Sequence, residues 1–265
     1  MLITSLTNPT VKHLVRMRDN RARRKAGRVL VDGWRETKRA LEAGLRPLGV
    51  YATQFERADW ATELASDALC RVSDDVLQKI AYGQSDRGVV AEFERPAWNL
   101  QELQVPCSGL ILVMDRIEKP GNAGAVFRCA DACGADAVLL TPESSDPFNP
   151  NLIRSSLGAV FTVPSASVSE QDARQWLAQR DYRVCAARVE SSRPLWESDL
   201  TGPLAIVIGN EADGLGANWQ SDDKLSIDGV RIPMLGQVDS LNASVAAAVI
   251  LYESQRQRSN LNPNP

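Results

Sequence analysis

Residues 232–253 read Ile-Pro-Met-Leu-Gly-Gln-Val-Asp-Ser-Leu-Asn-Ala-Ser-Val-Ala-Ala-Ala-Val-Ile-Leu-Tyr-Glu. A strand that ends at Ile232 meets a loop with a proline and a glycine, and Ser240 and Asn242 stand where an Ala- and Val-rich helix begins. Ser and Asn side chains at such a boundary can cap the free backbone N–H groups of the first turn. Capping does not account for residues 233–236, a loop that offers bare backbone and one methionine to a ligand.

The bulk properties favour a soluble protein of the cytoplasm. The chain has 265 residues, enough for two domains, and 44% of them are hydrophobic, enough for a core. No apolar run approaches the roughly 18 residues of a membrane span, and the N-terminus lacks a signal-peptide core. Five scattered cysteines predict reduced thiols, and a single histidine predicts no metal site.

The net charge of −3 hides a basic N-terminal arm, residues 1–28, with eight basic side chains against one acidic. Such a cluster is typical of a solvated helix face, and it is also what a phosphate backbone would contact. The candidate RNA-binding residues in the arm are Lys12, Arg21, Arg23, Arg24 and Lys25.

Alternating short strands and helices predict a small α/β domain over residues 1–95. A basic amphipathic helix is expected at 8–20. Further helices are expected at 35–43, 58–66 and 74–81, and strands at 28–33, 48–52, 70–72 and 88–93. Two prolines among polar residues then indicate a linker at 96–107.

A stronger α/β pattern predicts a second domain over residues 108–258, followed by a flexible tail at 259–265. The continuous apolar run Leu110–Met114 is typical of a strand buried on both faces of a parallel sheet. Strands are expected at 110–114, 137–141, 160–164, 182–187, 204–209 and 224–232. Helices are expected at 122–134, 148–157, 169–179 and 242–257.

Two further motifs follow buried strands of this second domain. The first is Asn122-Ala-Gly-Ala-Val-Phe-Arg128, at a transition from loop to helix, and the second is Ile206-Val-Ile-Gly-Asn-Glu-Ala-Asp-Gly-Leu-Gly216. Glycines at the carboxyl end of a strand allow a ligand to approach closely. A dinucleotide site is disfavoured, because Glu211 and Asp213 would repel a pyrophosphate and no βαβ unit with a ribose-binding acid follows.

Together the three motifs resemble those of the SpoU/TrmH family of RNA 2′-O-ribose methyltransferases, in the SPOUT superfamily. The resemblance rests on Asn-x-Gly-x-x-x-Arg at 122–128, Ile-Gly-Asn-Glu-x-x-Gly at 208–214 and Ile-Pro-Met-x-Gly-x-x-x-Ser-Leu-Asn-x-Ser-Val-Ala at 232–246. The N-terminal region is more loosely similar to the family's substrate-binding domain, which is like ribosomal protein L30e, through Ser5-Leu-x-Asn-Pro-x-Val-Lys12 and Val29-Leu-Val-Asp-Gly33.

The resemblance implies a C-terminal segment threaded into a deep trefoil knot, an exception to the unknotted rule. The knot crossings would form the pocket for S-adenosylmethionine. The family is typically a homodimer whose active site is completed across the interface, and the helices at Asn122 and Asn242 are the candidates for that contact. The residues that would hold or approach the cofactor are Thr141, Gly209, Ile232, Met234 and Leu241.

The resemblance gives Arg128 the central catalytic role, near the target hydroxyl and phosphate. Because the pKa of arginine lies above about 12, phosphate binding and alkoxide stabilisation are easier roles for it than base action. Arg154, in Arg-Ser-Ser-x-Gly158, would hold an RNA phosphate or form an ion pair. The residues that would orient Arg128 and the nucleotide are Asn122, Glu211, Ser240 and Asn242.

We therefore expect an enzyme that methylates RNA, with ribosomal RNA of the large subunit favoured over transfer RNA and with no DNA or membrane partner. Two alternatives stay open. The target could be transfer RNA, or the chain could be a noncatalytic RNA-binding factor of ribosome assembly. Methyl transfer to RNA discriminates the enzyme from the binding factor.

Overall fold

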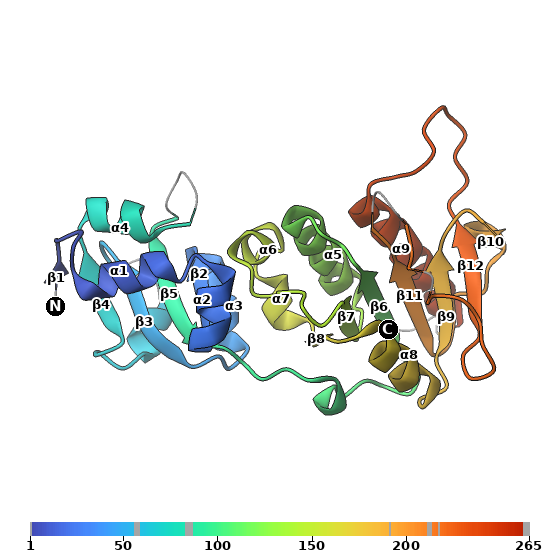
Figure 1. Ribbon diagram of the computed structural model, residues 1–265, viewed down its shortest axis with the longest axis horizontal. Coiled ribbons are helices and arrows are strands. Elements are labelled where there is room, and N and C mark those ends of the chain that lie inside the picture. The colour runs from blue at the N-terminus through green and yellow to red at the C-terminus, as the bar shows by residue number, and fades with distance from the viewer. Residues whose placement is uncertain are drawn as a thin grey trace. The chain divides into compact units, whose positions relative to one another are not determined.

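The computed structural model describes residues 2–55, 59–82, 87–190, 192–210, 214–216 and 218–261 (Figure 1). The chain forms two compact units. The first comprises Met1–Ala97 and Phe148–Thr162, and the second comprises Trp98–Pro147 and Val163–Pro265. Phe148–Thr162 lies inside the domain expected over 108–258, so the first unit is built from two separate stretches of chain.

The first unit has a five-stranded mixed sheet with the order β1-β4-β3-β5-β2. Its strands are β1 Leu2–Ile3, β2 Arg28–Asp32, β3 Pro47–Ala52, β4 Leu69–Val72 and β5 Val89–Glu94. Its helices are α1 Pro9–Arg16, α2 Asn20–Ala26, α3 Trp34–Glu42, η1 Asp59–Glu63, α4 Asp74–Ile80, α6 Pro150–Ser155 and α7 Ala159–Thr162.

The basic helix expected at 8–20 ends already at Arg16, and a second short helix, which the sequence did not predict, follows over Asn20–Ala26. The Asn8 side chain accepts from the Thr10 N–H at the start of α1, and the Asp19 side chain accepts from the Ala22 N–H at the start of α2. Gly27, with φ 63°, then ends α2. An acid that can cap therefore starts a second short helix in the basic arm.

Two groups of helices, α1 with α4 and α3 with α6 and α7, pack against the first sheet. α1 and α4 pack together and bury a cluster in which Leu14 and Ile80 meet Leu30 and Val90 of the sheet. α3 packs on β2 and β5, and it also contacts α7, while α6 contacts β2. The segment 148–162 thus completes the apolar cover of the first unit.

The second unit has a seven-stranded sheet in which every described pair is parallel, with the order β10-β12-β9-β11-β6-β7-β8. Its strands are β6 Leu110–Asp115, β7 Ala137–Thr141, β8 Ser165–Ser167, β9 Arg183–Ala187, β10 Ser192–Pro194, β11 Leu204–Ile208 and β12 Ile227–Arg231. Its helices are η2 Leu100–Glu102, α5 Pro120–Cys133, α8 Glu170–Ala178, η3 Leu195–Glu197 and α9 Ala243–Leu261. The α/β class with a parallel sheet is confirmed. The knot stays a prediction.

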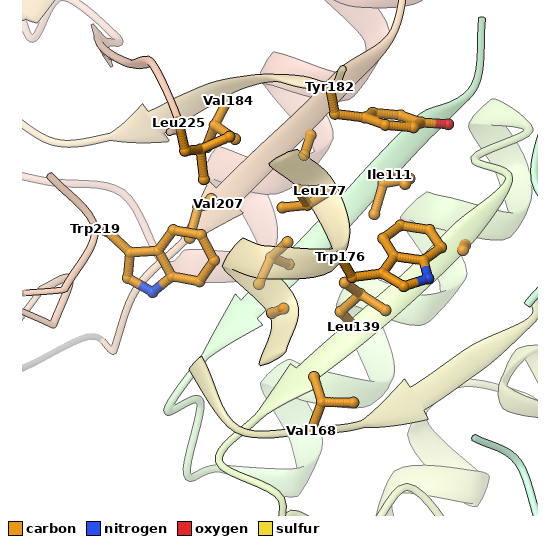
Figure 2. Close-up of a cluster of buried hydrophobic side chains, with 14 of the residues drawn as sticks. Ile111, Leu139, Val168, Trp176, Leu177, Tyr182, Val184, Val207, Trp219 and Leu225 are labelled. Carbon is orange, nitrogen blue, oxygen red and sulfur yellow. The ribbon is translucent and has the colours of Figure 1, made fainter. Parts of the chain in front are cut away.

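The central strands β6 and β11 are buried on both faces, as the apolar run predicts. On one face, Trp176 and Leu177 of α8 pack with Ile111 and Val207 (Figure 2). Because side chains alternate along a strand, the neighbours of Ile111 point to the other face. There α9 contacts β11 and packs against α5.

Two further expected elements differ in the structure. The strand expected at 160–164 is the helix α7, and β8 begins only at Ser165, because Phe161 is buried in the first unit and stacks on Phe148 at 6.3 Å between ring centroids. The tail expected at 259–265 is helical as far as Leu261, and residues 262–265 lie outside the described residues. In the described part of the chain, no helix has the length and apolar character to span a membrane.

Candidate active site

A cavity of about 640 Å³ opens in the second unit where strands of the parallel sheet end. Its walls are residues 187–190 after β9, residues 208–210 and 214–216 after β11, residues 230–234 at the end of β12, and residues 239–241 with the first turns of α9. The carboxyl ends of parallel strands share one edge of a sheet, which is where open α/β sheets bind ligands.

The structure brings four of the five expected cofactor residues to this cavity, namely Gly209, Ile232, Met234 and Leu241. Thr141 is the exception within the described chain. It is buried, and its hydroxyl donates to Asp115 Oδ1 at 2.7 Å, so it is linked to the cavity wall only through Asp115, which accepts from the Gly216 N–H.

Gly209 is required because two backbone segments meet there. A Cβ on Gly209 would lie 2.5 Å from the carbonyl carbon and oxygen of Gly214 and 2.7 Å from the nitrogen of Leu215. Real Cβ atoms are essentially never that close, and backbone atoms cannot rotate away. Any side chain at 209 would therefore push residues 214–215 away from β11 and deform the cavity wall.

Asp115, the last residue of β6, anchors that same wall. Its side chain is 0% exposed, and its Oδ2 accepts from the Gly216 N–H at 2.9 Å and from Arg116 Nε at 3.4 Å. Arg116 Nη2 in turn donates to the Gly214 carbonyl at 3.3 Å, and the Arg116 carbonyl accepts from Asn210 Nδ2 at 2.9 Å. The sequence carries one signal for this anchor, an acid that directly follows a fully apolar run.

Two buried donors at the cavity fit S-adenosylmethionine. Trp219 is 1% exposed, and its Nε1–H has no hydrogen-bond partner among the described residues, and the same holds for Arg188 Nε. Both residues line the cavity, as do Glu190 and Asp239. The adenosine and carboxylate groups of S-adenosylmethionine carry acceptors for such donors, and its ammonium and sulfonium groups suit the two acids.

Among the expected catalytic residues, Asn122 of α5 and Asn242 lie together, with Asn242 Nδ2 donating to Asn122 Oδ1 at 3.2 Å. Asn242 also caps α9: its Oδ1 accepts from the Ser244 N–H at 2.9 Å, and its carbonyl accepts from the Ala246 N–H at 2.9 Å. One residue thus has both a capping role and a contact between helices.

The remaining catalytic candidates are dispersed within a single chain. Ser240 lines the cavity. Arg128 lies on the exposed face of α5, away from the cavity lining, and no described residue forms an ion pair with it. Glu211 lies outside the described residues.

The thiols of α5 are not activated. Burial raises the pKa of the Cys129 thiol, although the neighbouring Arg128 guanidinium opposes that shift, and burial raises the pKa of Cys133 to about 11. A raised pKa keeps a thiol protonated and a poor nucleophile. Across the part of the chain that the structure describes, no three His, Cys, Asp or Glu side chains could hold a metal ion together.

The basic arm needs one correction. Lys12, Arg21, Arg24 and Lys25 are exposed, but Arg23 is 1% exposed. Its Nη1 donates to the carbonyls of Met17 at 3.0 Å and Arg18 at 2.7 Å, across the break between α1 and α2. Arg23 is therefore a structural residue whose guanidinium does not face solvent.

Arg154 is also engaged within the first unit. Its Nη1 donates to the Tyr82 carbonyl and lies 3.5 Å from Asp32 Oδ2. This arrangement attaches α6 to the end of β2. Of the two roles expected for Arg154, the structure supports the ion pair.

Two family models match the sequence. Residues 109–252 match the SpoU rRNA Methylase family, and residues 8–91 match the MRM3-like substrate binding domain. The first match contains all three motifs, and the second contains most of the basic arm and of the first sheet.

Individual relatives match over most of the chain. The 23S rRNA (uridine(2479)-2'-O)-methyltransferase of Streptomyces viridochromogenes is 34% identical over 248 residues, which are 89% of this chain and 85% of the relative. A solved RNA 2′-O ribose methyltransferase is 38% identical with a TM-score of 0.83, covering 97% of this chain and 99% of its own. An AdoMet-bound rRNA methyltransferase from Sinorhizobium meliloti is 28% identical with a TM-score of 0.86, covering 97% of each chain.

Proposed function

Because the chain belongs to the SpoU rRNA methylase family, we propose that it transfers the methyl group of S-adenosylmethionine to a ribose 2′-hydroxyl of large-subunit ribosomal RNA. The observation that carries this proposal is the cavity at the carboxyl ends of the strands, which the second and third motifs line together. An AdoMet-bound relative of the same fold supports the cofactor, and a relative that acts on 23S rRNA supports the substrate.

The chain's own residues would hold the cofactor chiefly through backbone. Gly209 allows residues 214–216 to close one wall, and Ile232, Met234 and Leu241 form the facing wall. When bound, S-adenosylmethionine supplies an electrophilic methyl group on a good leaving group. We propose that the C-terminal segment of the chain, which forms these walls, is threaded into the trefoil knot.

Arg128 would bind the phosphate beside the target ribose and stabilise the alkoxide that develops on the 2′-oxygen. A guanidinium stays protonated at neutral pH, so its contribution is charge and a fixed fork of donors. Asn122 and Asn242, which already lie in hydrogen-bond contact, would position the nucleotide together with Ser240 and Glu211. The methyl acceptor and donor are then aligned with little further ordering.

We propose that the active site needs two copies of the chain. Arg128 does not line the cavity of its own chain. In the loop between β12 and α9, the side chains of Leu235, which is 99% exposed, and Val238 face solvent. The helix α9 that follows exposes Val245 and Tyr252. An apolar surface of this kind marks an interaction site, and a two-fold dimer would cover it and bring α5 of the partner to the cavity.

The exposed cations of the arm would contact RNA phosphates, which favours binding without fixing sequence. They are Lys12, Arg21, Arg24 and Lys25. We place the enzyme in the cytoplasm, with its ribosomal substrate.

Transfer of a labelled methyl group from S-adenosylmethionine to ribosomal and transfer RNA tests the function. Arg128→Ala is expected to lose transfer by at least about 100-fold, the scale of one transition-state charge contact, while still binding the cofactor. Arg180→Ala, which removes an arginine packed on Trp176 in the same unit, is the matched control. Undiminished transfer by Arg128→Ala would remove Arg128 from the mechanism, and RNA binding without any methyl transfer would favour the assembly factor.

Mixing two inactive variants tests the shared active site. A heterodimer of Arg128→Ala and Gly209→Ala chains has one site with both an intact cavity and an intact arginine, if the arginine comes from the partner. We expect activity to return on mixing. If both residues act within one chain, the mixture stays inactive.

A further inference from the structure

Three segments of chain lie together at one edge of the first unit's sheet: those after β2 and β3 and the one before β5. β5 lies between β2 and β3 and is antiparallel to both, with Asp32 paired to Val90 and Ala52 paired to Val89. The carboxyl ends of β2 and β3 therefore lie beside the amino end of β5. The residues that follow or precede these ends are rich in aromatic and arginine side chains.

Aromatic rings gather at this edge. The ring of Trp34, at the start of α3, lies 6.4 Å from that of Phe55 in an edge-on arrangement and 5.7 Å from that of Trp60. The Trp34 indole covers the backbone before β5, since a Cβ on Gly88 would lie 2.5 Å from its Nε1. All three rings keep part of their surface in solvent.

Two arginines are fixed beside the rings by a buried acid. Glu36, whose side chain is 2% exposed, accepts from Arg35 Nη2 at 2.9 Å and from Arg87 Nη1 at 3.0 Å. Arg87 packs against the turn after β2, since its Cδ lies 3.2 Å from the position of a Cβ on Gly33, where φ is +122°. Arg35 is nevertheless 51% exposed and Arg87 is 35% exposed. One acid holds two cations, so the cluster of Glu36, Arg35 and Arg87 itself carries one net positive charge.

We propose that this aromatic edge, defined as Trp34, Phe55, Trp60, Arg35 and Arg87, binds an unpaired base of the RNA substrate. RNA-binding proteins read single-stranded RNA by stacking splayed bases on aromatic rings and on guanidinium planes. The rings and the planar guanidinium groups offer stacking surfaces, and the charges of the arginines attract the adjoining phosphates. Because Glu36 already fixes both guanidinium groups, binding orders few additional rotamers.

The inference rests on the proposed function for its choice of ligand, and two alternative roles for the aromatic edge compete with it. The rings could serve only to pack η1 on α3. A protein partner could cover them, but paired arginines beside the rings complement a polyanion better than an apolar protein surface. In both cases RNA affinity would be independent of these side chains.

The test measures the affinity of the full chain for a short fluorescein-labelled single-stranded RNA and for the same strand in a duplex. Trp60→Leu keeps apolar bulk but removes the stacking face, so we expect single-strand binding to weaken by about 5- to 150-fold, the range for one stacked base. Trp60→Phe should retain most of the affinity. Duplex binding should not change, because paired bases are already stacked. Trp196→Leu, which alters an exposed tryptophan of the second unit, is the matched control.

Wild-type affinity of Trp60→Leu for the single strand would overturn the proposal, and so would an equal loss for the duplex or for Trp196→Leu. If Trp60→Leu fails to fold by circular dichroism, Arg87→Lys replaces it. That variant keeps the charge and loses the planar face, so single-strand affinity should fall while its salt dependence stays the same. A chain that binds single strands through this edge yet transfers no methyl group would refute the proposed function and leave this inference standing.

Discussion

Replacing Asp115 by alanine should weaken cofactor binding more than its distance from the cavity suggests. The side chain accepts from Gly216 N–H at 2.9 Å and from Thr141 Oγ1 at 2.7 Å, and it is fully buried. A hydrogen bond to a charged group contributes about 1.5–3 kcal/mol, and an orphaned buried donor costs about 1–3 kcal/mol. Gly216 can escape that penalty only by moving its N–H into water, which opens the cavity wall. Cofactor binding must then close the wall again. The free-energy cost of this step should raise the Kd for S-adenosylmethionine by roughly 10- to 150-fold.

The assay is calorimetric titration with S-adenosylmethionine beside urea unfolding. Asp115→Asn should recover most of the affinity, because its amide oxygen can accept from Gly216 while its NH2 donates to the hydroxyl of Thr141. Asp136→Ala is the matched control, since Asp136 Oδ2 accepts from the Leu110 N–H at 2.7 Å at the opposite end of β6. It should lose stability and keep its Kd. The reasoning is refuted if Asp115→Ala folds, is destabilised, and still binds the cofactor as wild type does.

Three further outcomes are expected. Gly209→Ala should abolish measurable cofactor binding in the same titration while RNA affinity is retained, because its Cβ would strike backbone at 2.5 Å. Hydrogen bonding to Arg256 holds the pKa of Glu253 at about 2 against an ordinary 4.5, so its stabilisation is present above about pH 4.5 and disappears as the pH falls toward 2. Glu253→Gln should therefore unfold at lower urea than wild type at pH 7, and the two should converge near pH 2. The double substitution Arg21→Ala with Arg24→Ala should weaken RNA binding, with the cofactor Kd unchanged, and should lower the salt slope by about one for each phosphate that is no longer neutralised.

The sequence located much of the cavity because its motifs follow buried strands. Apolar runs such as Leu110–Met114 identify the interior strands of a parallel sheet, and the carboxyl ends of such strands must share an edge. The family resemblance assigned Gly209, Ile232, Met234 and Leu241 to one cofactor site, and the strand-end rule supplies a physical reason only for Gly209 and Ile232, which directly follow β11 and β12. The capping role of Asn242 was predicted from its place before the helix, but its hydrogen bond to Asn122 within one chain was not, because the helices at Asn122 and Asn242 were expected to meet across a dimer interface.

Other features depend on contacts between residues far apart in the sequence. Asp115, at the end of β6, meets Gly216 beyond the neighbouring strand β11, and an aspartate that merely opens a loop after a strand would leave the same signal in the sequence. Arg23 looks like its exposed neighbours in a basic run, and only the break between α1 and α2 turns it toward backbone carbonyls. Phe161 is as apolar as a strand residue, and its partner Phe148 decides the outcome.

The two-part composition of the first unit constrains how the chain folds during synthesis. The ribosome makes domains from the N-terminus at about 5–20 residues per second, and an N-terminal domain usually completes first. Here the apolar side chains of Ile153 and Phe161 are buried in the first unit, and α6 contacts β2. That unit cannot finish until residue 162 has left the exit tunnel, by which time β6 and β7 of the second sheet have already been made. The nascent chain must therefore keep an incomplete first unit soluble while the second begins, and a fragment cut at the linker would keep that exposed apolar surface permanently.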